Sequence, residues 1–504
     1  IGLAGAGASS GMAMAHWEIQ GWMILILGWV FVPFYSRSMV YTMPEFLERR
    51  YNPQSRTILS VISLVSYVLT KVAVTVYAGG LVFQQVFGIK ELWGIDFFWI
   101  AAIGLVVLTA LYTIFGGMKS VLYTSVLQTP ILLLGSLIIL VLGFKELGGW
   151  DEMMRVCGAV TVNDYGDTMT NLIRSNDDAN FPWLGALIGS AIIGFWYWCT
   201  DQFIVQRVLS GKNEKEARRG TIFGAYLKLL PVFLFLIPGM IAFALHQKYI
   251  GAGGEGFLPM LANGTANADA AFPTLVAKLL PAGVKGLVVC GILAALMSSL
   301  ASLFNSSAML FTIDFYKRFR PETPEKKLVG IGQIATVVIV ILGILWIPIM
   351  RSVGDVLYTY LQDVQSVLAP GIAAAFLLGI CWKRTSAQGG MWGLIAGMII
   401  GLTRLGAKVY YSNAGEVADS TFKYLFYDMN WLFFCGWMFL FCIIVVIVVS
   451  LATEAPTAEK IQGLVFGTAT KEQKAATRAS WDHWDIIHTA IILAITAAFY
   501  WYFW

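Results

Sequence analysis

The chain has 504 residues, of which 58% are hydrophobic and 13% are charged. Soluble proteins carry about 25% charged residues, so this composition excludes an ordinary soluble domain. The net charge of +4 says little by itself, and the positions of the basic residues are more informative. Apolar runs of about 20 residues recur along almost the whole chain, and each is long enough to cross a hydrocarbon core of ~30 Å. The pattern is typical of an all-α polytopic membrane protein.

The apolar runs, taken in chain order, predict one partial span and twelve complete ones. The partial span covers 1–10, where the Gly-rich run IGLAGAGASS is too short to cross a bilayer. The chain starts at Ile1 without Met or a signal peptide, so we expect that residues upstream have been lost. The complete spans are expected over 11–35, 57–86, 94–116, 121–145, 183–209, 219–246, 284–316, 328–350, 355–382, 388–409, 430–452 and 483–504.

The connecting loops differ in charge. Lys and Arg gather in 36–56, 207–219, 317–327, 383–384 and 454–482. The loop over 147–182 is rich in Asp and Asn instead. Because cytoplasmic loops carry an excess of Lys and Arg, the basic loops are expected in the cytoplasm and loop 147–182 outside. We expect a multi-pass protein of the plasma membrane, with a bacterial inner membrane favoured. Asn263 begins an Asn-Gly-Thr glycosylation acceptor, a motif that is common by chance.

Motifs of enzymes are weak in this sequence. The run GLAGAG over 2–7 has no preceding strand and no βαβ unit around it. There are four His and no HExxH motif, and the six Cys show neither metal nor disulfide spacing. We therefore expect no enzymatic activity and no nucleic-acid partner.

Several polar side chains lie inside the predicted spans, where each is costly and marks a pathway or a partner. They are Glu18, Lys71, Lys228, Gln362, Asp363, Ser298, Ser299 and Ser302. A Lys or Glu near a helix end can instead extend its charge to the interface. Small residues such as the serines can instead serve close helix packing. Both alternatives remain open at this point.

The stretch GFWYWCTDQFIVQR over 194–207 places clustered rings and polar groups within one span. Gly185, Gly189 and Gly194 are expected to interrupt this helix. A helix broken near the bilayer midplane exposes backbone carbonyls to cations and polar ligands. Aromatic faces stack on a sugar ring while amides and charges bind its hydroxyls. The alternative is an interfacial belt of aromatic residues.

Four motifs carry a family resemblance: WYWCTDQFIVQRVLSGKN, GAYLKLLPVFLFLIPGM, ALMSSLASLFNSSAMLFTIDFYKRF and VLAPGIAAAFLLGICWKR. Together they resemble the sodium/solute symporters, specifically the sodium/glucose cotransporter branch. The resemblance implies a LeuT-type five-plus-five inverted repeat with additional C-terminal helices. The transport core would cover 1–382, with additional transmembrane helices over 383–453, a cytoplasmic linker over 454–482 and a last transmembrane helix over 483–504.

The resemblance also implies site residues. Glu18 and Lys228 resemble the pair that binds sugar hydroxyls, and Gln362 resembles an amide with the same role. Tyr197 resembles the gate beneath the pyranose, and Trp198 is its neighbour. Na⁺ is implied as the coupling ion, held by the Ala295 carbonyl and the Ser298 and Ser299 hydroxyls.

Three departures from the family pattern change the expectations. The first half of the first core helix is absent, so the chain as given is expected to lack part of the sodium site. Ser125, in YTSVLQT, stands where many members carry Asp, which favours one Na⁺ per solute. Gly194 stands where relatives place Asn or Thr, so one side-chain contact to the sugar would be absent.

The resulting hypothesis is Na⁺-coupled symport of a hexose such as glucose or galactose into the cell by alternating access. Its partners would be a small-molecule sugar, the sodium ion and the lipid bilayer. Uptake of inositol, sialic acid or another polyol is an alternative within transport. A sugar-gated sensor or ion leak is an alternative of another class.

Overall fold

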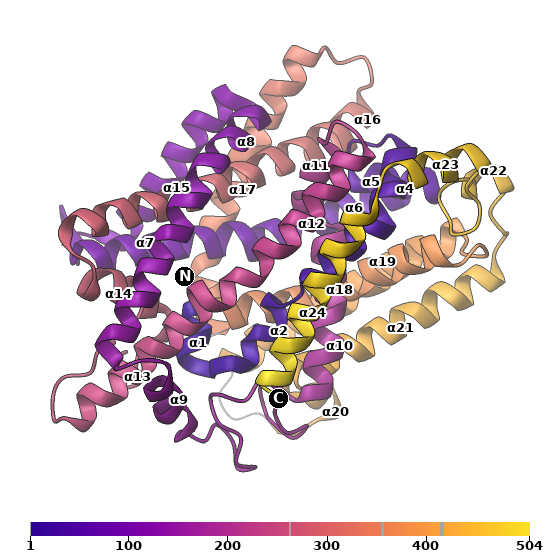
Figure 1. The fold of residues 1–504 in the computed structure, drawn as a ribbon. Helices are drawn as coiled ribbons and strands as arrows, with labels where there is room; N and C mark the ends of the chain where they lie inside the picture. The colour runs from indigo at the N-terminus through magenta and orange to yellow at the C-terminus, as the bar shows by residue number, and fades with distance from the viewer. Residues whose placement is uncertain (1, 262–263, 354–356, 414–417) are drawn as a thin grey trace.

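The computed structural model describes residues 2–261, 264–353, 357–413 and 418–504. For residues 112, 114–122, 124, 125, 127 and 350–353 it describes the backbone alone. Asn263 of the expected glycosylation acceptor lies outside the described residues. Helices form almost the whole described chain (Figure 1). The strands described are β1 (Glu91–Leu92) and β2 (Ile95–Asp96), which form one short antiparallel hairpin.

The elements of the first half run from Gly2 to Gly251, the last residue of α13. They are α1 (Gly2–Ser10), η1 (Gly11–Met14), α2 (Ala15–Glu18), α3 (Gly21–Ile26), η2 (Leu27–Phe31), α4 (Val32–Ser38), α5 (Met43–Arg50), α6 (Pro53–Ser66), η3 (Tyr67–Val72), α7 (Ala73–Phe87), α8 (Phe97–Leu147), α9 (Trp150–Gly158), α10 (Trp183–Gly194), η4 (Phe195–Thr200), α11 (Gln202–Leu209), α12 (Glu214–Pro231), η5 (Val232–Leu236) and α13 (Ile237–Gly251).

The second half continues as a series of long helices joined by short ones. They are η6 (Ala268–Ala270), α14 (Ala271–Leu279), α15 (Ala282–Met309), η7 (Leu310–Tyr316), α16 (Lys317–Phe319), α17 (Glu325–Val353), α18 (Leu357–Cys381), α19 (Ala387–Asn413), α20 (Thr421–Lys423), η8 (Tyr424–Asp428), α21 (Trp431–Ala452), α22 (Ala458–Ile461), α23 (Lys471–Ala479) and α24 (His483–Tyr502).

Eleven helical segments of the described chain are long and apolar enough to cross a membrane, and Phe97–Leu111 is a shorter apolar segment. Each of the twelve predicted complete spans therefore has a counterpart. Two boundaries differ from the prediction. The segment over 1–10 joins the next one in a run from Gly2 to Ser38. The predicted break over 117–120 is absent, because α8 continues through it as one helix.

The break within 183–209 does not occur at the glycines, so that prediction was wrong. α10 runs unbroken from Trp183 to Gly194. Gly185 and Gly189 instead allow α21 to approach closely, because a Cβ on Gly189 would lie 2.8 Å from Leu432 Cδ2. The helix breaks at Asp201, whose backbone is extended and whose side chain accepts a hydrogen bond from Phe203 N. The break therefore follows the aromatic cluster rather than preceding it.

The basic loops meet at one end of the helix bundle, toward the upper right in Figure 1. Arg318 Nη1 donates to Pro53 O at 2.7 Å, which joins loops 317–327 and 36–56. The linker contacts the same end, because Lys460 Nζ donates to Tyr51 O at 2.8 Å. Arg219 pairs with Asp482 at 2.7 Å at the start of α24. That this end faces the cytoplasm stays a prediction, as do the domain boundaries at 382, 453 and 482.

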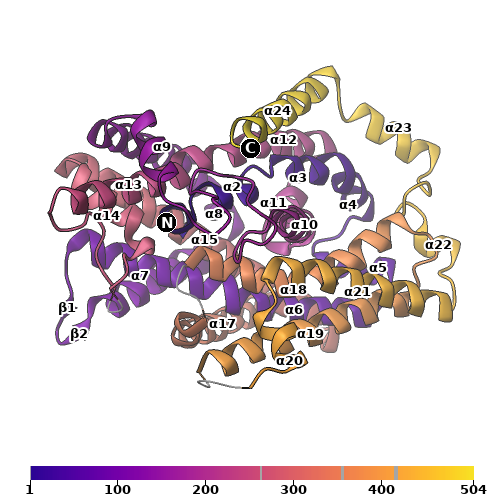
Figure 2. The same ribbon diagram turned by 90° about the horizontal axis from the view of Figure 1, so that it is seen from below.

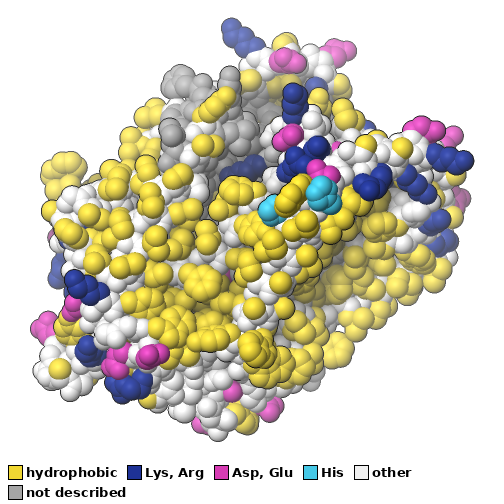
Figure 3. Space-filling model, viewed as in Figure 1, with side chains coloured by type: hydrophobic (Ala, Val, Ile, Leu, Met, Phe, Trp, Pro, Cys, Tyr) yellow, Lys and Arg dark blue, Asp and Glu magenta, His cyan; other side chains and the backbone are white. Residues whose placement is uncertain are grey.

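Apolar side chains cover the middle of the face shown in Figure 3, and charged side chains gather at its two ends. α24 belongs to this surface and packs along α12 (Figure 2). Its first turn is held by Arg219, whereas its last turn meets loop 147–182 where Leu172 N donates to Phe503 O at 3.2 Å. α24 thus runs from one charged end to the other, as a membrane-crossing helix does.

Candidate solute-binding site

A cavity of about 210 Å³ lies where α2, α10, η4, α12 and α18 meet. All five predicted solute-binding residues line it: Glu18, Tyr197, Trp198, Lys228 and Gln362. Its remaining lining residues are Trp17, Gln20, Ile193, Gly194, Tyr358, Leu361 and Gln365. Residues separated by more than 300 positions in the chain therefore share one chamber.

Glu18 and Lys228 form an ion pair at the wall of this cavity. Lys228 Nζ lies 2.6 Å from Glu18 Oε2, and the two side chains are 14% and 6% exposed. Tyr358 Oη donates to the other carboxylate oxygen, Oε1, at 2.5 Å. The alternative in which Lys228 extends to the interface is therefore excluded. A low-dielectric cavity strengthens such a pair, and both groups can exchange partners with a hydroxylated ligand.

The aromatic side chains form the apolar part of the cavity. The rings of Tyr197 and Trp198 lie edge to face, with centroids 5.1 Å apart. Lys228 Nζ lies 5.4 Å from the centroid of the Trp198 ring. Both rings belong to η4, a π-helical turn, and such turns are frequent at functional sites. They place apolar ring surface beside the charged pair.

Amide side chains complete the chamber, and two of them were missed by sequence reasoning. Gln362 is 6% exposed, and its Oε1 has no hydrogen-bond partner among the described residues. Gln365 lies one turn further along the same face of α18, and Gln20 lies two residues beyond Glu18. Helical spacing of i and i+3 from Gln362 could have identified Gln365. Helical spacing from Glu18 does not identify Gln20, because the chain turns between α2 and α3.

Lys71 is paired inside the protein. This also excludes the alternative in which Lys71 extends its charge to the membrane interface. Its Nζ contacts Asp201 Oδ2, and both side chains are buried. Tyr67 Oη donates to Asp201 Oδ1 at 2.9 Å. Lys71 Nζ also lies 5.0 Å from the centroid of the Tyr197 ring and 4.4 Å from that of Phe203. The pair thus ties η3 to the break between η4 and α11, directly beyond the aromatic wall of the chamber.

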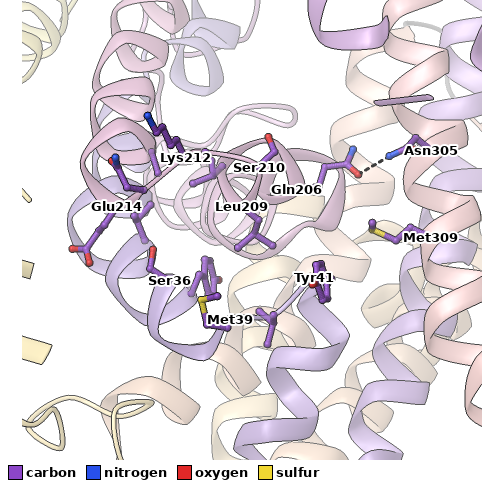
Figure 4. Close-up of a pocket in the computed structure, with 17 residues that line it drawn as sticks. Ser36, Met39, Tyr41, Gln206, Leu209, Ser210, Lys212, Glu214, Asn305 and Met309 are labelled. Carbon is purple, nitrogen blue, oxygen red and sulfur yellow. Dashed lines mark hydrogen bonds between the residues drawn. The ribbon is translucent and has the colours of Figure 1, made fainter. Parts of the chain in front are cut away.

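A second cavity, of about 500 Å³, opens on the other side of this break (Figure 4). α11 contributes Gln206, and α15 contributes Asn305 and Met309. Asn305 Nδ2 donates to Gln206 Oε1 at 3.4 Å, as the dashed line in Figure 4 shows. Tyr41, in a basic loop, also lines the cavity. The same broken helix therefore lines both cavities, through Tyr197 in the first and Gln206 in the second.

The three predicted sodium ligands lie within two turns of α15 and do not line the first cavity. Ala295, Ser298 and Ser299 are partly buried, and none of them lines that cavity. Ser302, one turn further, accepts a hydrogen bond from Arg207 Nη2 at 2.6 Å and donates to Ser298 O at 2.9 Å. Ser302 therefore stabilises contact between α11 and α15. The sodium role of the other three stays a prediction, and the side chain of Ser125 lies outside what the structure describes.

Comparison with known proteins agrees with this architecture. The model of the sodium:solute symporter family matches residues 1–397. A human sodium/myo-inositol cotransporter 2 is 36% identical over 481 residues, covering 93% of this chain and 70% of the relative. A sodium/glucose cotransporter 1 from Ovis aries is 37% identical over 472 residues, covering 90% and 70%. A sodium/glucose cotransporter 4 from Danio rerio is 35% identical over 499 residues, covering 95% and 74%.

A solved Na⁺-coupled sialic acid symporter, in a substrate-bound outward-open state, has the same fold. Its TM-score is 0.68 at 21% sequence identity, covering 90% of this chain and 86% of that one. Helices broken around a polar chamber, in this topology, form the LeuT-type inverted repeat of membrane transporters. The chain belongs to the sodium:solute symporter family. It is a multi-pass protein of the plasma membrane and a transporter rather than an enzyme.

Proposed function

We propose that this chain carries a hexose such as glucose or galactose into the cell together with Na⁺, with one Na⁺ per sugar. The observation that carries the proposal is the chamber that holds the Glu18–Lys228 ion pair, the Gln362 amide and the rings of η4 within about 210 Å³. Typical small-molecule sites measure about 300–1,000 Å³, so a chamber of this size suits a single ring rather than a disaccharide. The sodium/glucose cotransporters among the relatives support the same solute class.

The chamber disfavours an anionic solute such as sialic acid. Lys228 is the one cation among the described residues that line it, and it already pairs with Glu18. A carboxylate on the solute would have to compete with Glu18 for that cation and would bring a second negative charge into the cavity. A neutral polyol instead meets amides and a paired charge, which can donate to and accept from its hydroxyls.

A second candidate is myo-inositol, which is also a neutral ring with hydroxyls around it. The observation in its favour is the human sodium/myo-inositol cotransporter 2, whose identity of 36% is close to the 37% of the sheep sodium/glucose cotransporter 1. Glucose and myo-inositol differ in which ring positions carry hydroxyl groups. Overall identity therefore does not separate these solutes, and the choice lies in individual side chains.

Sodium coupling supplies enough energy for uptake with one ion. A membrane potential of 100 mV supplies ~2.3 kcal/mol per charge. A tenfold Na⁺ gradient adds roughly 1.4 kcal/mol. One Na⁺ per solute could therefore support a solute gradient of roughly several hundredfold. Coupling further requires that Na⁺ bind the outward-open and inward-open states with different affinity.

The two cavities suggest the route. Solute would bind beside Tyr197 and leave through the cavity at Gln206, once the contact of Lys71 with Asp201 separates. The second cavity faces the basic end of the bundle, which is the predicted cytoplasmic side. In this proposal, the two cavities open alternately on either side of the break in the helix.

The full chain, reconstituted in proteoliposomes, tests the proposed function. An inward Na⁺ gradient should drive accumulation of labelled glucose or galactose, whereas an equal K⁺ gradient should not. Preferential accumulation of myo-inositol would favour the second candidate. A solute-evoked current without accumulation would show a sensor or a leak and overturn the proposal. The reversal potential of the coupled current measures the stoichiometry, and a ratio of two Na⁺ would contradict a single ion.

A further inference from the structure

Gln20 and Gly194 meet at one wall of the solute chamber. Gln20 lies between α2 and α3, and Gly194 is the last residue of α10. A Cβ placed on Gly194 would overlap Gln20 Oε1 and lie 3.0 Å from Gln20 Cδ. It would also lie 3.3 Å from Met23 Cγ. The missing side chain of Gly194 therefore leaves the space that the Gln20 amide occupies.

The orientation of this amide follows from its hydrogen bond to Ser190. Gln20 Nε2 donates to Ser190 O at 2.8 Å. A carbonyl can only accept, so the nitrogen must face Ser190 and Oε1 must point the other way, toward Gly194. Gln20 is 2% exposed, and no hydrogen bond to its Oε1 occurs within the described part of the chain. Because Gln20 lines the chamber, this free acceptor can take a hydrogen bond from a ligand or a water molecule there.

We propose that Gln20 is a specificity-determining residue, whose Oε1 accepts a hydrogen bond from one ring hydroxyl of a neutral polyhydroxylated solute. Gly194 is a positioning residue that leaves Gln20 room to do so. Both residues line the chamber with Glu18, Lys228 and Gln362. The inference rests on the proposed function, and it names the side chain that would read one hydroxyl of the solute.

Glu18 and Gln362, which also line the chamber, do not replace Gln20 in this role. Both carboxylate oxygens of Glu18 already accept hydrogen bonds, from Lys228 and Tyr358. Gln362 Oε1 is also without a partner among the described residues, but it lies on α18. Two neutral acceptors on different segments of the chain can therefore read two different hydroxyls. A site built to bind a hydroxyl strongly rejects an analogue that lacks it.

The direction of this hydrogen bond can be tested with solute analogues. The full chain in proteoliposomes would be assayed for Na⁺-driven uptake of the preferred sugar or cyclitol, with mono-deoxy and mono-deoxyfluoro analogues as competitors. Fluorine accepts weakly and cannot donate. If Gln20 accepts from one hydroxyl, the deoxy and the deoxyfluoro analogues at that ring position should both compete at least tenfold more weakly than the parent.

The variant Gln20→Leu should then lose discrimination at that one position and keep it at the others. Gln462→Leu, an exposed glutamine in the linker, is the matched control and should keep every ratio. A merely structural role for Gln20 would lower uptake of all analogues together without changing their ratios. Ratios that survive unchanged in Gln20→Leu would overturn this inference alone. Absence of Na⁺-driven uptake of any sugar or cyclitol by the wild type would overturn the proposed function, and this inference with it.

Thermal unfolding in detergent tests separately whether Gly194 leaves the space that the Gln20 side chain occupies. Gly194→Ala should lower the midpoint of unfolding, because the new Cβ overlaps Gln20 Oε1. In the Gln20→Ala background the same change should lower the midpoint much less. Equal effects in the two backgrounds would show that Gly194 does not position Gln20.

Discussion

Lys228 Nζ lies 2.6 Å from Glu18 Oε2, and this ion pair joins α12 to the end of α2 at the wall of the solute chamber. The two residues are 210 positions apart in the chain. Tyr358 on α18 completes the contact through the second carboxylate oxygen. Three helices are therefore coupled through one carboxylate, so a solute that exchanges these hydrogen bonds would act on all three.

Lys228→Ala should abolish Na⁺-driven uptake. The same change leaves Glu18 buried without its cation, and breaking a buried ion pair costs about 3–5 kcal/mol. The double variant Glu18→Gln with Lys228→Met should recover most of that stability but no uptake. Uptake and thermal unfolding of the three proteins separate binding from folding. Lys423→Met, which removes a cation paired with Asp419 and Asp428 outside the chamber, is the control. Wild-type accumulation of sugar by Lys228→Ala would contradict the assignment.

Ser299→Ala should weaken the dependence of uptake on Na⁺. Na⁺ prefers oxygen ligands, and loss of one hydroxyl ligand should raise the Na⁺ concentration for half-maximal uptake about tenfold, or ~1.4 kcal/mol. Ser306→Ala on the same helix is the control, because the Ser306 hydroxyl donates to its own helix at Ser302 O. The measurement is uptake against Na⁺ concentration at fixed solute. An equal shift in both variants would point to helix packing rather than to an ion site.

Asp269 should make stability depend on pH. It lies in η6, outside the membrane-spanning segments, and accepts from Leu357 N at 3.1 Å and 3.2 Å. Burial raises the pKa of its carboxyl to about 7, although the hydrogen bond from Leu357 lowers it. Since an unfolded Asp titrates near about 3.9, the folded state keeps a proton that the unfolded state releases between these values. The free energy of unfolding should therefore fall as pH rises from about 4 to about 7, by up to about 1.4 kcal/mol per pH unit.

Asp269→Asn should remove that slope, because the amide does not titrate. Unfolding midpoints between pH 5 and 7.5 would show it, with Asp164→Asn in the exposed part of loop 147–182 as the control. Parallel pH profiles of wild type and Asp269→Asn would show that Asp269 is ionised in the folded protein throughout this range.

Gly239→Ala should destabilise the protein, because α1 and α13 meet there backbone to backbone. A Cβ at Gly239 would overlap Ala4 O and lie 2.8 Å from Ala4 C. Overpacking of this kind costs about 1–3 kcal/mol. Gly220→Ala is the matched control, because a Cβ there meets nothing within 4 Å. In that helix alanine is favoured over glycine, so the control should keep or raise the unfolding midpoint. Equal midpoints for the two variants would contradict the close contact.

The membrane spans could be predicted because hydropathy is a local property of the chain. The apolar segments, their order and the clustering of basic loops follow from runs of apolar residues and from the positions of Lys and Arg. The break predicted between 94–116 and 121–145 did not, because α8 is one helix there. The break at Asp201 could not be placed in this way. Glycines suggested it earlier in the helix, but Gly185 and Gly189 instead serve contact with α21. The sequence alone does not distinguish a glycine that ends a helix from one that lets a neighbouring helix pack closely.

For the site, the sequence by itself determined which polar side chains lie within the spans, and the resemblance selected Glu18, Lys228, Gln362 and the rings of η4. Only the tertiary structure decided their partners. It brought Lys71 to Asp201, placed Gln20 in the space left by Gly194, and left the serines of α15 outside the lining of the chamber. The physical reason is that burying a polar group is costly unless it finds a partner, and these partners lie on helices far apart in the chain.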